Sequence, residues 1–308
     1  MATQRAGLVM MAVLLVAGAC DAEDASPEVV TARGLELNGF LLNGFLLNGE
    51  KLDGAPGTTD YIRITAVDLK GGNKGGTSWL TGSTLAVEGN GGVVFSGAAL
   101  IDARIEYDLS EGTKGPHKKS VRIVGVEPLA PGSDVMLYEL ELHDGGWKPL
   151  CEGGAKAILL GDVWEPATGD RISGPNDGAV TFACRGAALA KCVEYGYRPW
   201  ATAGNVSLRE YHQACTRMVR ADYCGEGLAH TTNGTPIHVV DKVGVQNVDP
   251  NVNYVVEAEW NADGATCLNP ANTRHPNQVI GCTIPTCNKK TSFAAGGLIQ
   301  SGKVLAGP

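Results

Sequence analysis

Alternating apolar and polar residues predict a series of β-strands between residues 60 and 184. In a half-buried strand successive side chains point to opposite faces, so a period of two indicates this structure. The clearest runs are 61–67, 103–107, 119–126 and 135–142, with further strands expected at 155–164 and 179–184. Gly, Asn, Asp and Pro clusters separate the runs, and the links are too short for helical crossovers. We therefore expect an α+β fold that is mainly antiparallel β, either a sandwich or barrel-like.

Two helices are expected in the C-terminal half. Residues 187–195 predict a short helix that ends at Gly196, which suits a left-handed cap. A longer helix is predicted over 208–224, because Ser207 to Glu210 has the capping-box form and Gly225 can end it. Its apolar face contains Leu208, Tyr211, Cys215, Met218 and Val219. A further strand is expected at 254–260.

The N-terminus predicts export. An apolar run from Gly7 to Ala19 follows one positive charge, Arg5, and is shorter than the roughly 20 residues of a membrane-spanning helix. Residues 1–19 therefore indicate a signal peptide. The run ends in Val-Ala-Gly-Ala-Cys, which resembles a bacterial lipobox and implies cleavage before Cys20 and lipidation of its thiol. Residues 17–19 also fit an ordinary A-x-A cleavage site.

After the leader we expect four segments. Residues 20–36 are polar and acidic and predict a lipid anchor with its tether. Residues 37–54 repeat every five positions as Leu-Asn-Gly, with Asp replacing Asn in the last unit. This pentad repeat partly resembles pentapeptide-repeat β-helices and predicts either a turn-rich segment packed on the main domain or a partner, or a partly ordered linker. A β-rich domain is expected over 60–295 and a C-terminal tail over 296–308.

Charge excludes one class of function. The chain has a formal net charge of −8, and removal of Arg5 with the leader makes the mature protein more acidic still. Non-specific nucleic-acid binding requires a basic surface. We therefore expect no nucleic-acid partner, while the hydrophobic content of 44% can supply a folded core.

The cysteines support both export and lipidation. There are nine, and lipid on Cys20 would leave eight for four disulfides. These eight are Cys151, Cys184, Cys192, Cys215, Cys224, Cys267, Cys282 and Cys287. No C-x-x-C pair occurs, so disulfides are favoured over a zinc or redox site. Helix geometry favours a Cys192–Cys215 bridge, and proximity in sequence favours Cys282–Cys287. The alternative is a secreted protein with one spare thiol.

Candidate catalytic residues surround the second helix. His212, Asp222, His230 and Asp241 could in principle form a hydrolase site after folding. Along one helix, however, ten residues separate His212 from Asp222 by about 15 Å, which excludes a direct hydrogen bond. Asp222 is expected to bond to local amides or to Arg217, Arg220 or Lys191. The alternative for each histidine is a buried packing role.

We expect neither metal nor cofactor. Residues 249–253 begin like a calcium loop but lack its glycine and its final glutamate, so a turn is predicted there.

Residues Ala221, Asp222, Tyr223 and Cys224 spell a motif that resembles the name-giving sequence of the ADYC-domain family. The flanking segments 181–184, 190–192, 196–200 and 212–220 resemble that family as well, over roughly residues 150–290. The resemblance implies a bacterial envelope protein of a type often seen in myxobacteria, and it implies no known reaction.

Two functions are therefore predicted. The first is an envelope lipoprotein that faces away from the cytoplasm and acts as a structural or ligand-binding module. Its expected partners are the inner or outer membrane, through the lipid, and an envelope protein or glycan. The alternative is an extracytoplasmic enzyme, hydrolase-like, with its site near the second helix.

Overall fold

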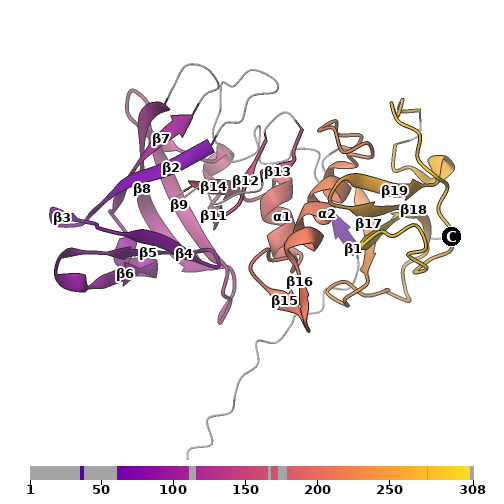
Figure 1. Cartoon of the computed structure of the whole chain (residues 1–308), viewed down its shortest axis with the longest axis horizontal. Helices are drawn as coiled ribbons and strands as arrows, with labels where there is room; N and C mark the ends of the chain where they lie inside the picture. Colours follow the sequence, from indigo (N-terminus) through magenta and orange to yellow (C-terminus); the bar gives the residue numbers. More distant parts are fainter. Residues whose placement is uncertain are drawn as a thin grey trace, which may run out of the picture.

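The computed structural model describes residues 35–37, 61–110, 116–165, 168–172, 179–232, 234–275 and 277–305. This part of the chain contains two β units with two helices between them (Figure 1). The strands pair antiparallel throughout, so the predicted fold class is confirmed. The predicted signal peptide, Cys20, and the repeat positions after Leu37 lie outside the described residues.

The first unit is a β-barrel. Its strands pair in the order β9-β11-β14-β2-β7-β8, and the pairing of β8 with β9 closes the ring. They span β2 (Tyr61–Leu69), β7 (Arg104–Ser110), β8 (Pro116–Pro128), β9 (Met136–His143), β11 (Ala157–Leu160) and β14 (Ala179–Cys184). In β9, Tyr138 and Leu140 are buried while Glu139 is exposed, as alternation requires.

A small sheet packs against this barrel with its apolar face. It consists of β4 (Ser78–Thr81), β5 (Thr84–Glu88) and β6 (Val94–Ser96). Leu85 and Val87 of β5 are buried in the same apolar cluster as the barrel interior. The Tyr138 hydroxyl accepts a hydrogen bond from the Leu85 amide at 2.8 Å, and burial raises the pKa of Tyr138 to about 12. The contact therefore joins the small sheet to the barrel.

Short elements complete this half of the chain. The strands are β3 (Asn73–Lys74), β10 (Trp147–Pro149), β12 (Val163–Trp164), β13 (Arg171–Ile172), β15 (Thr202–Ala203) and β16 (Val206–Ser207). The 3-10 helices are η1 (Asn90–Gly92), η2 (Gly97–Leu100) and η4 (Glu152–Gly154), with η5 (Pro270–Asn272) further along. The strand expected over 155–164 is thus divided into β11 and β12.

The second unit is a five-stranded sheet in the order β1-β17-β20-β18-β19. Its strands are β1 (Leu35–Leu37), β17 (Pro236–Asp241), β18 (Tyr254–Asn261), β19 (Gly264–Leu268) and β20 (Ile299–Val304). The prediction of a C-terminal tail from residue 296 is wrong, since β20 is the central strand. Likewise, β1 belongs to the sheet although its residues were expected at the junction of tether and repeat.

Two helices lie between these units (Figure 1). Helix α1 (Ala188–Glu194) contacts β14 of the barrel, and α2 (Arg209–Arg220) contacts α1 and strands β18, β19 and β20. One apolar cluster includes Ile158 of the barrel, Met218 of α2 and Ile299 of the sheet. The two β units therefore share a core around the helices.

The ends of α2 differ from the prediction. Ser207 pairs with Thr202 in a small hairpin, so its hydroxyl bonds only to the Arg209 amide, and Leu208 is the N-cap without a side-chain bond. Glu210 instead forms an ion pair with Arg171. The helix ends at Arg220 rather than near Gly225. The predicted capping box does not form, because Ser207 lies in the hairpin one residue before the N-cap Leu208 and Glu210 pairs with Arg171.

All eight predicted cysteines form disulfides. The Cys192–Cys215 bridge between α1 and α2 is confirmed. The Cys282–Cys287 prediction is wrong, because Cys282 bonds to Cys224 and Cys287 bonds to Cys267. Cys151–Cys184 is the fourth bridge. Nearness in sequence did not predict the pairing, because the fold brings Cys224, after α2, to Cys282 and Cys267, in β19, to Cys287.

Candidate functional site

The four motif residues lie where α2 ends. Ala221 is the helix C-cap in the left-handed conformation, with φ 53° and ψ 43°, and it is fully buried. The Ala221 amide donates to the Met218 carbonyl at 3.0 Å, and the Asp222 amide donates to the Arg217 carbonyl at 2.9 Å. These bonds close the last turn and direct Asp222 and Tyr223 into the core.

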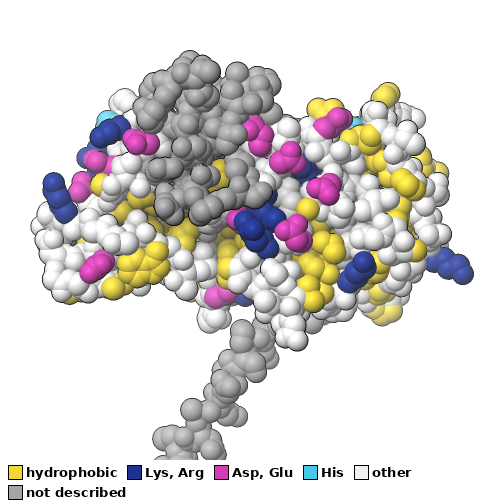
Figure 2. Space-filling view, viewed as in Figure 1, with side chains coloured by type: hydrophobic (Ala, Val, Ile, Leu, Met, Phe, Trp, Pro, Cys, Tyr) yellow, Lys and Arg dark blue, Asp and Glu magenta, His cyan; other side chains and the backbone are white. Residues whose placement is uncertain are grey.

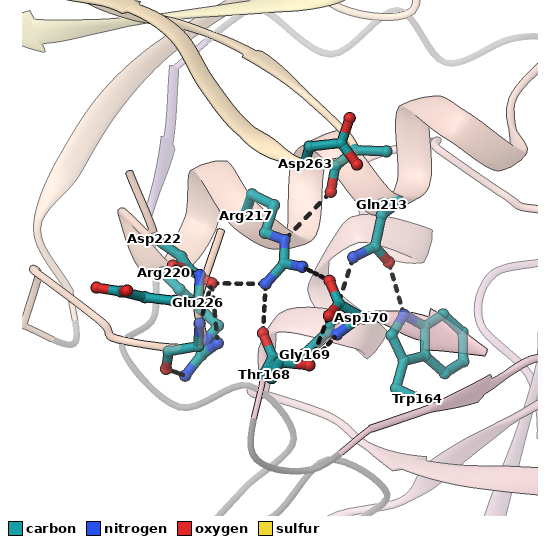
Figure 3. A network of polar contacts seen from close by, with 12 residues as sticks. Trp164, Thr168, Gly169, Asp170, Gln213, Arg217, Arg220, Asp222, Glu226 and Asp263 are labelled. Carbon is teal, nitrogen blue, oxygen red and sulfur yellow. Dashed lines mark hydrogen bonds and ion pairs between the residues drawn. The ribbon is translucent and has the colours of Figure 1, made fainter. Parts of the chain in front are cut away.

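Asp222 forms a buried ion pair with Arg217 (Figure 3). The Asp222 side chain is 0% exposed, and its Oδ2 lies 2.7 Å from Nη1 of Arg217. Asp222 also accepts hydrogen bonds from the amides of Glu226 and Gly227 at 3.1 and 3.0 Å, and Arg220 lies 3.6 Å away. The predicted bonding of Asp222 to Arg217 and local amides is confirmed.

Arg217 and Gln213 connect α2 to the turn between β12 and β13. Arg217 donates to the carbonyls of Thr168 and Ala262 and pairs with the Asp170 carboxylate. Gln213 accepts from the Trp164 indole at 2.7 Å and donates to the Gly169 carbonyl at 2.9 Å (Figure 3). The side chains of Arg217 and Gln213 are thus bonded to the protein itself.

Tyr223 leads to a second buried network. Its hydroxyl donates to Glu257 Oε1 at 2.8 Å, and its ring stacks on Trp260 with centroids 5.2 Å apart. Arg274 donates hydrogen bonds to the same carboxylate from Nε and Nη2, and its Nη1 donates to the Met218 carbonyl at 3.0 Å. Ser301 of β20 also donates to Glu257, at 2.8 Å. The carboxylate is therefore saturated with donors.

Charge pairing determines the ionisation of this network. Burial alone would raise the pKa of Glu257, but the charge and hydrogen bonds of Arg274 outweigh it and the pKa lies below its ordinary value. Burial likewise opposes the charge on Arg274, and Glu257 raises its pKa above the ordinary value. Burial and the neighbouring Glu257 raise the pKa of Tyr223. The pair stays ionised and the phenol stays neutral.

The candidate His212 is buried away from the other candidates. One ring nitrogen, Nε2, lies 3.0 Å from the Leu189 carbonyl of α1, while Nδ1 is buried and has no hydrogen-bond partner among the described residues. Burial lowers the pKa of His212 to about 4, so the imidazole is neutral near pH 7. Its ring packs beside Trp164 with centroids 5.6 Å apart.

His230 and Asp241 also bond locally. His230 Nδ1 lies 3.1 Å from the Ala221 carbonyl. Asp241 accepts from the Tyr197 hydroxyl at 2.9 Å and from the amides of Val243, Val245 and Gln246. No hydrogen bond joins any two of the four candidates in the described part of the chain. The geometry does not favour the hydrolase alternative at these positions, which stays a prediction.

Sequence reasoning missed Glu257 and Arg274. Glu257 stands in a strand that we interpreted only by its apolar neighbours, and Arg274 stands in a segment with no regular pattern. Two glutamates in an otherwise apolar strand were the available signal, because a buried carboxylate requires a cation or several donors. The partner itself comes from 17 positions away, and sequence spacing gives no indication of it.

The described residues contain neither a candidate metal site nor a candidate membrane-spanning helix. No group of three His, Cys, Asp or Glu side chains there has the spacing to hold a metal ion. No helix among them combines the length and apolar character needed to cross a membrane. Asp249 accepts from the amide and side chain of Asn251, which is the turn that we predicted.

The structure defines a disulfide-linked protein in which α2 and the five-stranded sheet meet at the Ala221–Cys224 corner. A family model described as the ADYC domain matches residues 97–274, more than half of the chain. The chain therefore belongs to the ADYC-domain family. The match starts earlier and ends sooner than the predicted 150–290, and it includes β7 to β9 of the barrel. Searches of curated proteins and of solved structures found no match.

Proposed function

We propose that the protein is a binding module of the bacterial cell envelope, attached to a membrane by lipid on Cys20. Disulfides form and persist in oxidising compartments, and the chain carries four of them between residues 151 and 287. The fold is therefore suited to an extracytoplasmic location. The family name adds no reaction, since the ADYC domain has no known function.

Cysteine pairing is the observation that supports the anchor. Eight of the nine cysteines are paired with one another, which leaves only Cys20 without a cysteine partner in this chain. Cys20 is also the residue at the lipobox-like cleavage point. Lipidation explains both its position and the odd number of thiols. Membrane attachment facing away from the cytoplasm follows from the same proposal.

The use of buried polar groups supports binding rather than catalysis. Arg217, Asp222, Glu257 and Arg274 are each bonded to other parts of the fold, so they stabilise one arrangement of α2, the turn between β12 and β13, and the five-stranded sheet. A rigid frame of this kind presents surface loops to a partner at low entropic cost. Figure 2 shows acidic and basic side chains interspersed on one face, which suits an envelope protein or glycan better than nucleic acid.

Processing of the precursor tests the anchor. Globomycin, which blocks lipoprotein signal cleavage, is expected to cause precursor accumulation, and Cys20→Ala protein should lose its lipid and leave the membrane fraction. Cys20→Ala protein that is released should still contain four disulfides by peptide mapping, because Cys20 is not part of any bridge. Normal processing with globomycin and with Cys20→Ala would contradict lipidation and leave a secreted protein.

A further inference from the structure

The Cys224–Cys282 bridge differs from the other three disulfides in its exposure to solvent. Cys282 is exposed and Cys224 is partly exposed. Each of the other bridges includes at least one buried cysteine, and these buried residues are Cys151, Cys184, Cys192, Cys215 and Cys267. A thiolate opens a disulfide by attacking one of its sulfur atoms, so access to that sulfur limits the exchange. Cys224–Cys282 is therefore the most accessible of the four bridges.

The Cys267–Cys287 bridge is the nearest competitor, because Cys287 is also partly exposed. Attack on Cys287 would expel Cys267 as a thiolate, and Cys267 is 0% exposed in β19. Burial disfavours a charged thiolate, and a disfavoured thiolate leaves slowly. Attack on Cys282 instead expels Cys224, which is in contact with water. Access and the leaving group therefore both favour exchange at Cys224–Cys282.

The main chain around Cys224 is fixed independently of the bridge. The Tyr223 carbonyl accepts a hydrogen bond from the Ala265 amide at 2.9 Å, and the Gly225 amide donates to the Asp222 carbonyl at 3.2 Å. Both bonds would persist if the bridge were open. Cys224 is therefore expected to keep its place after reduction.

The segment that contains Cys282 has much weaker attachments. Residues 278–284 have no helix or strand and no main-chain hydrogen bond to another backbone group in the described part of the protein. Ile280 and Ile284 pack, partly buried, against the apolar cluster that contains Met218. The next main-chain contact is at Pro285, whose carbonyl accepts from the Leu268 amide at 2.8 Å. The bridge is thus the strongest attachment of residues 278–284 to the fold.

We propose that Cys224–Cys282 is a site of thiol–disulfide exchange with a dithiol outside the cytoplasm, and that reduction of the bridge releases residues 278–284. One thiolate of the dithiol attacks Sγ of Cys282, forms a mixed disulfide and expels Cys224 as a thiolate, which takes up a proton. The second thiol of the dithiol loses its proton and attacks the mixed disulfide, and Cys282 leaves and is protonated. Two electrons pass to the bridge, and the dithiol becomes a disulfide.

Release of the segment changes the surface that the protein offers to a partner. Ile280 and Ile284 cover part of the apolar cluster while the bridge is closed. Once the bridge is open, this cover can separate from the cluster and leave apolar surface in contact with water. Exposed apolar surface of this kind binds other proteins.

Stepwise reduction of the full, folded protein tests the proposal. Oxidised protein is treated with dithiothreitol or with reduced thioredoxin, new thiols are alkylated, and mass spectrometry identifies the labelled cysteines. Cys224 and Cys282 should be labelled together and at least about 10-fold faster than the other six bridging cysteines, because access and leaving group both favour them. Labelling with both reagents would show that a protein dithiol can act, and labelling with dithiothreitol alone would restrict the partner to small dithiols.

A double variant, Cys224→Ser/Cys282→Ser, serves as the matched control. It should lack the fast-reacting bridge and should bind a hydrophobic dye as strongly as reduced wild type does. Proteinase K should cut both proteins within residues 278–284 and leave oxidised wild type uncut there. Circular dichroism confirms that the rest of the fold is intact. The proposal is overturned if another bridge is reduced first, if all four open together only on unfolding, or if residues 278–284 stay resistant after reduction.

Discussion

Each of the four motif residues secures a different part of the fold. Ala221 ends α2, Asp222 pairs with Arg217, Tyr223 reaches Glu257 of β18, and Cys224 bonds to the segment before β20. The four contacts meet where α2 joins the five-stranded sheet. Packing and charge pairing therefore account for the positions of the four residues.

Removing the Asp222 carboxylate is expected to destabilise the protein. Asp222→Ala leaves the buried Arg217 with Asp170, which is 61% exposed, as its remaining carboxylate partner in the described part of the chain and removes acceptors from two amides, at a cost of about 1–3 kcal/mol in unfolding free energy. Asp222→Asn keeps the shape and should cost less. Urea unfolding measures both. The control is Asp144→Ala, whose side chain is 73% exposed, with an expected change within about 0.5 kcal/mol. Equal losses for Asp222→Ala and Asp144→Ala would contradict the buried-pair account.

The lowered pKa of the buried His212 makes the unfolding free energy depend on pH. Its pKa falls from 6.5 to about 4 on folding, so below pH 6.5 the unfolded chain binds a proton that the folded protein excludes. The contribution of His212 to the unfolding free energy is fully present above pH 6.5. It decreases by roughly 1.4 kcal/mol per pH unit down to about pH 4. The unfolding free energy of wild type minus that of His212→Gln should decrease over this window. An unchanged difference from pH 7 to pH 4.5 would show that His212 is protonated in the fold.

At the level of elements, the alternation of apolar and polar residues predicted the strands well, whereas the capping motif did not predict the start of α2. β9 was predicted over 135–142 and spans Met136–His143, because its inward residues meet the barrel core on every second position. The predicted capping box of α2 was wrong, since Ser207 pairs in a hairpin before the N-cap Leu208 and Glu210 binds Arg171. A local capping signal fails where a distant partner binds one of its side chains, as Arg171 binds Glu210.

The bridge between α1 and α2 should contribute measurably to stability. Cys192 and Cys215 are separated by 23 residues, and a loop of this length corresponds to about 3 kcal/mol of unfolded-state entropy. The Cys192→Ala/Cys215→Ala double variant should lose about that much unfolding free energy. The Cys224–Cys282 bridge closes a separation of 58 residues and should be worth slightly more, about 4 kcal/mol. The measurement is chemical unfolding under non-reducing conditions. Losses below about 1 kcal/mol for both variants would assign the stability to packing alone.

At the scale of the whole molecule, the last strand connects the C-terminus to the core. β20 pairs with β17 on one side and with β18 on the other, and its Ser301 contacts Glu257. The family match ends at residue 274, so it includes β17, β18 and β19 but not the strand between them. A domain limited to the matched residues would contain a sheet without its centre.

Truncation distinguishes a tail from a structural strand. A chain ending after Leu298 lacks β20 and should fail to accumulate, because the edges of β17 and β18 would lose their hydrogen-bond partners and Glu257 would lose Ser301. A chain ending after Leu305 keeps the strand and should match wild type in yield and melting temperature. Yield is measured by immunoblotting of whole cells, and melting temperature is measured on the purified proteins. Normal yield of the shorter chain would contradict the central position of β20.

The sequence by itself determined the fold class, the presence of both helices, the set of bridging cysteines and the Cys192–Cys215 pair. These follow from short-range periodicity, from parity and from helix geometry. Only the tertiary structure decided the closure of the barrel, the central place of β20, the partners of Cys224, Cys267, Cys282 and Cys287, and the Glu257–Arg274 pair. Those contacts join residues far apart in the chain, where many pairings satisfy the same local pattern and the packing of the shared core selects one.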